Sequence, residues 1–174
     1  DGALYTASTA IKVWPLPAAQ SDRKLVGHAS TVTAMAHLHA GTHPALLLSS
    51  AASDRFLLLW NVAPGAPAAP IRTFACDSPP SFISMALSPS STVLLLAGCP
   101  ASTCLNVFEH TGGAGTPAGK GKGAAKPAQP ASRVRATPHP HRAFLAAAFT
   151  APGQVVAAHG TLAQPRFFVC GLAD

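Results

Sequence analysis

Residues 27–33 read G-H-A-S-T-V-T and residues 46–60 read L-L-L-S-S-A-A-S-D-R-F-L-L-L-W. Within these two segments, four side chains that can hydrogen-bond one another fall at fixed offsets. A Gly-His pair precedes a first strand-like run, a serine closes a second, an acid follows it in a turn, and a tryptophan ends a third. The four side chains belong to His28, Ser50, Asp54 and Trp60.

We predict that these four side chains form a structural hydrogen-bond relay. A carboxylate buried in a tight turn is costly unless it is hydrogen-bonded, and an imidazole, a hydroxyl and an indole N–H supply partners. Losing one partner is expected to cost about 3–5 kcal/mol if Asp54 is fully buried, and less otherwise. A Ser/His/Asp set also invites a hydrolase interpretation, which we do not favour. Ser50 lies inside an apolar run and lacks the G-x-S-x-G turn that exposes a nucleophile.

The aromatic residue that closes this stretch recurs along the chain. Trp14, Trp60 and Phe108 each end a strand-like run, and they follow one another at the interval of roughly 40–50 residues that propeller blades have. Ser8 stands where the first blade would carry its turn acid, so the first blade is expected to lack the relay. The predicted segments are 1–14, the end of one blade; 20–60, a complete repeat; 71–108, a third repeat; and 132–172, a degenerate fourth.

The Gly-His pair, the turn acid and the closing tryptophan resemble a WD repeat. The resemblance implies an all-β fold, a WD-repeat β-propeller in which sheets pack face to face around a central axis. The apolar runs 46–48 and 56–59 do not alternate, which indicates strands covered on both faces. The chain supplies about three and a half blades, whereas propellers need at least about four and WD-repeat ones usually have about seven. We therefore expect part of a larger ring.

Further details are similar to one group of WD-repeat proteins. They are G-H-A-S-x-V-T, S-S-A-x-S-D-R-x-L-x-x-W, V-F-E-H before an insertion, and H-G-T-x-x-Q-P-R-F. Together they resemble the WD-repeat subunits of the UtpA (t-UTP) subcomplex of the small-subunit processome. The resemblance implies a non-enzymatic scaffold in the nucleus and nucleolus that supports pre-ribosomal RNA transcription, processing and small-subunit assembly. Its implied partners are other UtpA proteins and processome subunits, with pre-ribosomal RNA and snoRNPs as further candidates.

Other functional classes have less support in the sequence. A generic WD-repeat adaptor, such as a ubiquitin-ligase substrate receptor or a signalling scaffold, would share every structural feature and remains an alternative. The 6 acids form no paired-carboxylate or nucleophile motif, so we expect no catalytic residues and no small-molecule substrate. The 4 cysteines form no C-x-x-C pair and the histidines match no zinc frame, so no metal or cofactor is expected. No apolar run reaches the roughly 18 residues of a membrane span.

Charge is scarce and unevenly distributed. Charged residues make up 10% of the chain, which indicates either a surface covered by other chains or a drift in composition towards small residues. The net charge of +6 favours an anionic partner.

The segment from Thr111 to Arg142 carries half of the 12 basic residues and no acid. Residues 111–131 are rich in Gly, Lys and Pro and are predicted to be a disordered insertion, because they cannot bury enough apolar area to order themselves. The segment is either an arm that contacts RNA phosphates or a solubilising loop. The basic residues in question are Lys120, Lys122, Lys126, Arg133, Arg135 and Arg142.

Overall fold

The computed structural model describes residues 2–16, 23–39, 44–88, 90–99, 104–111, 132–135, 144–151, 154–161 and 164–171. In these ranges every regular element is a β-strand, and no helix of the described part is long and apolar enough to cross a membrane. The strands are β1 (Gly2–Ala7), β2 (Ile11–Leu16), β3 (Arg23–Leu25), β4 (Val32–Leu38), β5 (Leu46–Ala51), β6 (Phe56–Asn61), β7 (Pro70–Ala75), β8 (Phe82–Leu87), β9 (Val93–Gly98), β10 (Cys104–His110), β11 (Ser132–Arg135), β12 (Phe144–Ala151), β13 (Gln154–Thr161) and β14 (Gln164–Gly171).

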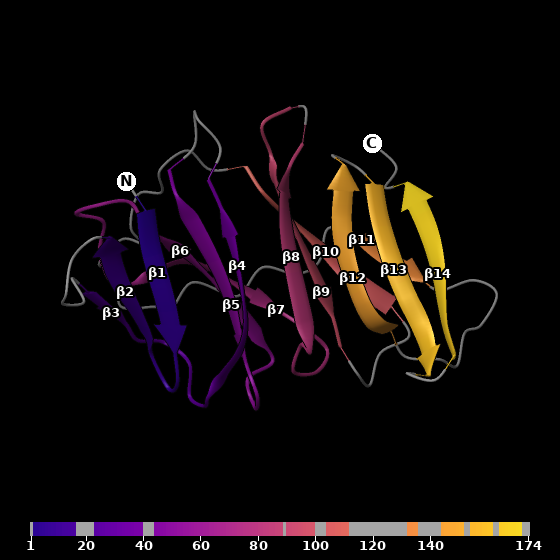
Figure 1. Ribbon diagram of the computed structural model, residues 1–174, viewed down its shortest axis with the longest axis horizontal. Coiled ribbons are helices and arrows are strands. Elements are labelled where there is room, and N and C mark those ends of the chain that lie inside the picture. The colour runs from indigo at the N-terminus through magenta and orange to yellow at the C-terminus, as the bar shows by residue number, and fades with distance from the viewer. Residues whose placement is uncertain are drawn as a thin grey trace.

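These strands form successive antiparallel sheets in chain order. The first sheet has the order β1-β2-β3, the second β4-β5-β6-β7, the third β8-β9-β10-β11 and the fourth β12-β13-β14. Figure 1 shows them side by side, from the first sheet at the left to the fourth at the right. Strand β8 contacts both β4 and β12, so the first strands of the last three sheets lie next to one another, as in propeller blades around their axis. The all-β, partial propeller predicted from the sequence is confirmed.

The sheets are offset by one strand from the sequence repeats. Strand β3 begins the 20–60 repeat but pairs with β2, β7 begins the next repeat but pairs with β6, and β11 begins the last but pairs with β10. The outermost strand of each of the first three sheets is therefore supplied by the following repeat. This offset ties each blade to the next through the chain itself.

Apolar side chains fill the space between successive sheets. Strands β5 and β9 are buried along their whole length, and they are inner strands of the second and third sheets, which lie between the first and the fourth. The burial of both faces of 46–48 agrees with the absence of alternation in that run. The largest cluster lies between the second and third sheets and includes Leu46, Leu48, Leu57, Leu59, Phe74, Val93, Leu95 and Phe108.

Two cysteines join the second and third sheets within that cluster. Cys76 follows β7 and Cys99 follows β9, and both are buried and free. Their side chains hydrogen-bond each other, which lowers the pKa of Cys99 to about 6. The same hydrogen bond, together with burial, raises the pKa of Cys76. The pair is thus a polar contact inside an otherwise apolar interface.

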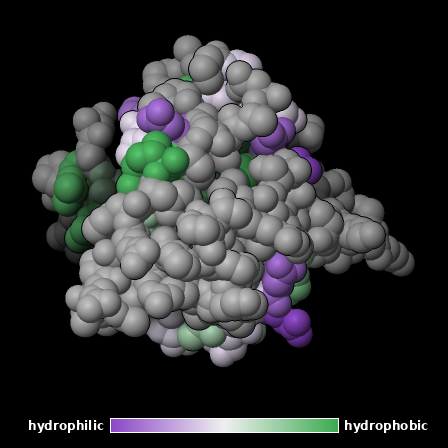
Figure 2. Space-filling view, turned by 90° about the vertical axis from the view of Figure 1, so that its right-hand side faces the viewer, coloured by the Kyte–Doolittle hydropathy of each residue, from purple (hydrophilic) through white to green (hydrophobic). Residues whose placement is uncertain are grey.

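The two end faces of the row are not covered by another described sheet. On the fourth sheet, Val169 is 62% exposed, and Figure 2 shows this end of the molecule with hydrophobic atoms beside hydrophilic ones. On the first sheet, Leu4 and Leu16 are each 53% exposed. Both faces therefore differ from the inner faces, where the large aliphatic side chains are buried.

Arg23 links the first sheet to the second. Arg23, on the outer strand β3, donates from Nη1 to the carbonyl of Ala66 at 2.8 Å and from Nη2 to the carbonyl of Val62 at 2.7 Å. Both carbonyls belong to the segment that follows β6. Because a guanidinium presents several donors in a rigid fork, one side chain can hold this segment at two points.

We expect Arg23→Ala to lower the free energy of unfolding by about 1–3 kcal/mol, since two carbonyls lose a charged donor. Lys24→Ala, which removes the neighbouring exposed cation, should change it by less than about 0.5 kcal/mol. Urea denaturation followed by tryptophan fluorescence measures both values. Equal losses in the two variants would mean that Arg23 does not act through these hydrogen bonds.

Candidate functional site

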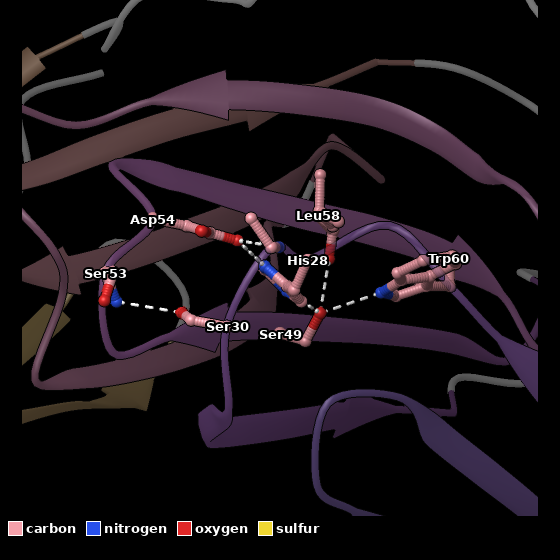
Figure 3. A network of polar contacts seen from close by, with 8 residues as sticks. His28, Ser30, Ser49, Ser53, Asp54, Leu58 and Trp60 are labelled. Atoms are coloured by element: carbon pink, nitrogen blue, oxygen red, sulfur yellow. Dashed lines mark hydrogen bonds and ion pairs between the residues drawn. The ribbon is translucent and has the colours of Figure 1, made fainter.

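A chain of hydrogen bonds runs through the second sheet from an indole to a carboxylate. Trp60 Nε1 on β6 lies 2.8 Å from Ser49 Oγ on β5, and this oxygen lies 2.8 Å from His28 Nε2 in the β3–β4 loop. The other ring nitrogen, His28 Nδ1, lies 2.7 Å from Asp54 Oδ2 in the β5–β6 turn. Figure 3 shows the four side chains pointing towards one another from these elements.

The partners fix the direction in which each proton is donated. The indole N–H is only a donor, so Ser49 accepts from Trp60. A neutral imidazole that donates from Nδ1 to the Asp54 carboxylate accepts at Nε2 from the Ser49 hydroxyl, which lies 2.8 Å away, whereas the other acceptor within reach of this hydroxyl, the Leu58 carbonyl, lies 3.5 Å away. Every donor along this line has an acceptor. The arrangement therefore satisfies four polar groups with very little water contact.

The serine of the relay is Ser49, and the prediction of Ser50 is wrong. Trp60 pairs with Leu47 across the β5–β6 ladder, and Ser49, two residues further, lies on the same face of the sheet. Ser50 lies on the opposite face, with Leu46 and Leu48, and its buried hydroxyl has no hydrogen-bond partner in the described part of the chain. The adjacent serines S-S offered two choices, and only the strand register separates them.

The loop around His28 is held at several further points. The Ala29 backbone N–H donates to Asp54 Oδ2 at 3.0 Å, and the Ser53 backbone N–H donates to Ser30 Oγ at 2.9 Å. A Cβ atom on Gly27 would lie 2.9 Å from Leu58 Cδ1 and 3.0 Å from the Trp60 ring. Close packing on Leu58 and the relay tryptophan thus favours glycine at this position, because a larger residue would displace these side chains. Ser30 was not singled out in the sequence, where nothing marks it apart from its neighbours.

The order Ser49–His28–Asp54 resembles a catalytic triad, but its burial prevents that use. Ser49 is 0% exposed, and its oxygen already accepts from Trp60. A nucleophile must reach a substrate carbonyl, and here the sheet itself covers the hydroxyl. Asp54 has only 11% of its side chain exposed and His28 only 2%. This site supplies stability and loop geometry.

The first and third sheets keep only parts of the relay. In the first sheet Trp14 Nε1 donates to Thr6 Oγ1 at 2.9 Å, which reproduces the bond between Trp60 and Ser49. Ser8 follows β1 in place of the turn acid. In the third sheet Phe108 takes the tryptophan position and is fully buried, so no indole donor is present there. The second sheet alone, in the described part, carries the whole set.

The candidate phosphate contacts are only partly placed. Lys120, Lys122, Lys126 and Arg142, and the predicted insertion up to residue 131, lie outside the described residues, apart from residue 111. Arg133 and Arg135 lie on β11, where their backbones pair with Asn106 and Cys104 of β10. Residues 132–135 therefore form the outer strand of the third sheet, where they pair with the edge of β10. Among the described residues, no three His, Cys, Asp or Glu side chains lie close enough to hold a metal ion.

Comparisons with known proteins identify the fold. No protein-family model and no curated protein matches the sequence. A chain in the crystal structure of the mitotic checkpoint complex matches with a TM-score of 0.64 at 14% identity, over 99% of this chain and 46% of that one. The β-propeller domain of Cps50 (Swd1) from Myceliophteria thermophila matches with a TM-score of 0.64 at 16% identity, over 98% of this chain and 52% of that one. The chain has a β-propeller fold and spans about half the length of these similar structures.

The two adjacent serines provide a sharp test of the relay. Ser49→Ala removes a group that bonds both His28 and Trp60, and we expect it to lower the free energy of unfolding by about 1–3 kcal/mol. Ser50→Ala removes a buried hydroxyl without a partner and should be neutral or stabilising. Thermal unfolding of both variants measures the difference. If Ser50→Ala were less stable than Ser49→Ala, the relay serine would be Ser50.

Removing the turn acid Asp54 should lower the free energy of unfolding more than removing an exposed acid. Because Asp54 is nearly buried and bonds both His28 and the Ala29 N–H, we expect Asp54→Ala to cost about 2–3 kcal/mol, somewhat below the range for a fully buried partner. Glu109→Ala removes an exposed acid on β10 and should stay within about 0.5 kcal/mol of the parent. Melting temperatures give the comparison, and a parent-like Asp54→Ala variant would contradict the structural role.

Proposed function

We propose that this chain is a non-enzymatic scaffold of the nucleolar small-subunit processome, supporting pre-ribosomal RNA transcription, processing and small-subunit assembly. In this role a rigid β-propeller presents loops and faces to neighbouring proteins and RNA. The proposed location is the nucleus and nucleolus, and the proposed partners are UtpA proteins, other processome subunits and pre-ribosomal RNA.

One observation carries the scaffold part of the proposal. The side chains that most resemble catalytic machinery, Ser49, His28 and Asp54, are bonded to one another inside the second sheet. Both ring nitrogens of His28 are occupied, so no base faces solvent there. These three side chains, which in another setting would suit a hydrolase, here hold two loops in place. Loops in fixed positions are what a binding platform requires.

The processome part rests on sequence resemblance. The stretches around 27–33, 49–60, 107–110 and 159–167 are similar to WD repeat-containing protein forty-three, a UtpA subunit. The two similar structures described above belong to a mitotic checkpoint complex and to Cps50 (Swd1), which favours assembly with other proteins in general. A WD-repeat adaptor of a ubiquitin ligase or a signalling complex is the second candidate on that observation.

The proposal that the chain binds RNA is based on the segment from Thr111 to Arg142, which carries half of the 12 basic residues. Lysine side chains contact phosphates without reading sequence, and each contact releases counterions, so the affinity falls with salt. We propose that Lys120, Lys122 and Lys126 act in this way, with Arg133, Arg135 and Arg142 as further candidates. A solubilising loop of the same composition would show no such effect on RNA.

Purification of the tagged chain from nucleolar extract tests the proposal. Pre-ribosomal RNA and processome proteins are expected, whereas a ligase and its substrates would favour the adaptor. In a binding assay with pre-ribosomal RNA, replacing the three lysines with Ala should reduce the salt slope by up to about 2–3 units if all three touch phosphates. Replacing exposed Lys24 with Ala serves as the control. An unchanged slope would remove the segment from RNA binding.

A further inference from the structure

Two thiols that are distant in the sequence meet between the second and third sheets. Cys76 follows β7, the outer strand of the second sheet, and Cys99 follows β9 in the third. Both are buried and free, and both belong to the large apolar cluster between these sheets. Because the sheets on both sides of this interface are part of the chain, no further blade is needed to complete it.

Hydrogen bonds hold the two thiols next to each other. The Cys99 thiol donates to the carbonyl oxygen of Ser78, two residues after Cys76, with 3.1 Å between sulfur and oxygen. The Ser81 backbone N–H donates to the Gly98 carbonyl at 2.9 Å. The segment between β7 and β8 is therefore fixed to the end of β9 at two points, and the two thiols hydrogen-bond each other. Side chains must be this close before a disulfide can form without movement of the backbone.

A buried amide lies beside the Cys99 sulfur. Asn106, on β10, is 0% exposed, and its Nδ2 lies 3.9 Å from Cys99 Sγ. Its Oδ1 has no hydrogen-bond partner among the described residues, so keeping the amide here lowers the stability of the fold. A pair of cysteines that served packing alone would not need a polar neighbour of this kind. The amide indicates that the charge and reactivity of the sulfur matter at this position.

The two sulfurs differ in their chemistry. The hydrogen bond from the Cys76 thiol lowers the pKa of Cys99 to about 6, burial opposes this shift, and the Ser78 backbone adds to it. Cys99 is therefore largely a thiolate, the reactive form, at neutral pH. The hydrogen bond to Cys99 and burial raise the pKa of Cys76, which stays a thiol. A thiolate next to a thiol is the arrangement in which one sulfur reacts with an oxidant and the other completes a disulfide.

We propose that Cys76 and Cys99 form a redox modification site that hydrogen peroxide oxidises to a disulfide, which joins the second sheet covalently to the third. The Cys99 sulfur attacks one peroxide oxygen, the O–O bond breaks, and a sulfenic acid and water result. The Cys76 sulfur then attacks the sulfenic sulfur and loses its proton, and the hydroxyl leaves as water. Two thiols and one peroxide thus give one disulfide and two waters, and the electrons lost by the sulfurs reduce the O–O bond.

Burial of the pair restricts the oxidant. Cys76 is 8% exposed and Cys99 is 1% exposed, and the exposed Asp77 follows Cys76 directly. Hydrogen peroxide is little larger than water, whereas glutathione disulfide is bulky and carries carboxylates that the Asp77 carboxylate repels. We therefore expect hydrogen peroxide to oxidise the pair faster than glutathione disulfide does at the same concentration.

The disulfide is expected to stabilise the junction of the two sheets. It closes the chain between residues 76 and 99, which removes conformations from the unfolded state. The melting temperature should rise by about 5–10 °C on oxidation and return to its first value after reduction with dithiothreitol.

Peptide mapping of the protein that carries this chain, before and after treatment with hydrogen peroxide, tests the proposal. No Lys or Arg lies between residues 73 and 119, so trypsin leaves both cysteines on one peptide, and a second cleavage before Asp77 separates them. After oxidation, mass spectrometry should find the two fragments linked. Cys104→Ser is the matched control, because it removes the third cysteine of the tryptic peptide and should form the link in the same yield. In Cys76→Ser, Cys99 should stop at the sulfenic acid, which dimedone traps.

Thiols that stay free in the folded protein, under a peroxide treatment that oxidises them in urea, would overturn the inference. Loss of the link in Cys104→Ser would do the same, because the disulfide would then involve Cys104. A melting temperature that falls on oxidation would show that the link does not fit the junction of the sheets. Faster oxidation by glutathione disulfide would contradict the assignment of peroxide as the oxidant. The parent protein supplies these readouts even if Cys76→Ser does not fold, and none of them depends on which partners the scaffold binds.

Discussion

The hydrogen bond of 2.7 Å between His28 Nδ1 and Asp54 Oδ2 is the contact on which the second sheet depends. It joins the β3–β4 loop to the β5–β6 turn, and it orients the imidazole so that the other nitrogen meets Ser49. A nearly buried carboxylate is tolerated only because an imidazole and a backbone N–H both donate to it. Gly27, next to His28, lies so close to the Trp60 ring and Leu58 that a larger residue would require these side chains to shift. One polar contact thus links the position of this loop to the turn between β5 and β6.

The offset between repeats and sheets explains how this local contact influences its neighbours. Strand β3 closes the first sheet and leads directly into the loop that carries His28, so the relay also fixes the exit from the first sheet. Arg23, on that strand, holds the segment after β6 through two carbonyls. Apolar burial between the sheets is the larger stabilising force, but it has little directional preference. Hydrogen bonds at the ends of the strands determine how one sheet is placed on the next.

The sheets are similar in outline and differ in how they meet their surroundings. The second sheet has a complete relay and two buried faces, whereas the first keeps only the bond between Trp14 and Thr6 and exposes a face with two lysines. The third has replaced the tryptophan with Phe108, which packs against Phe74 at 5.2 Å between ring centroids. Among the described residues, only the second sheet keeps the whole relay, although the third sheet also lies between two others.

The sequence by itself determined the all-β class, the repeat, and the identity of three relay residues, because Gly-His, the turn acid and the closing tryptophan are local signals at fixed offsets. It did not distinguish Ser49 from Ser50, since a strand places neighbouring residues on opposite faces and a shift of one residue changes the face. The membership of β3, β7 and β11 in the preceding sheets was also hidden, because pairing depends on contacts distant in sequence. Only the tertiary structure placed Lys12 directly opposite Lys24, on the face of the first sheet that points away from the second, since strand register and the position of the next sheet together decide which side chains are covered.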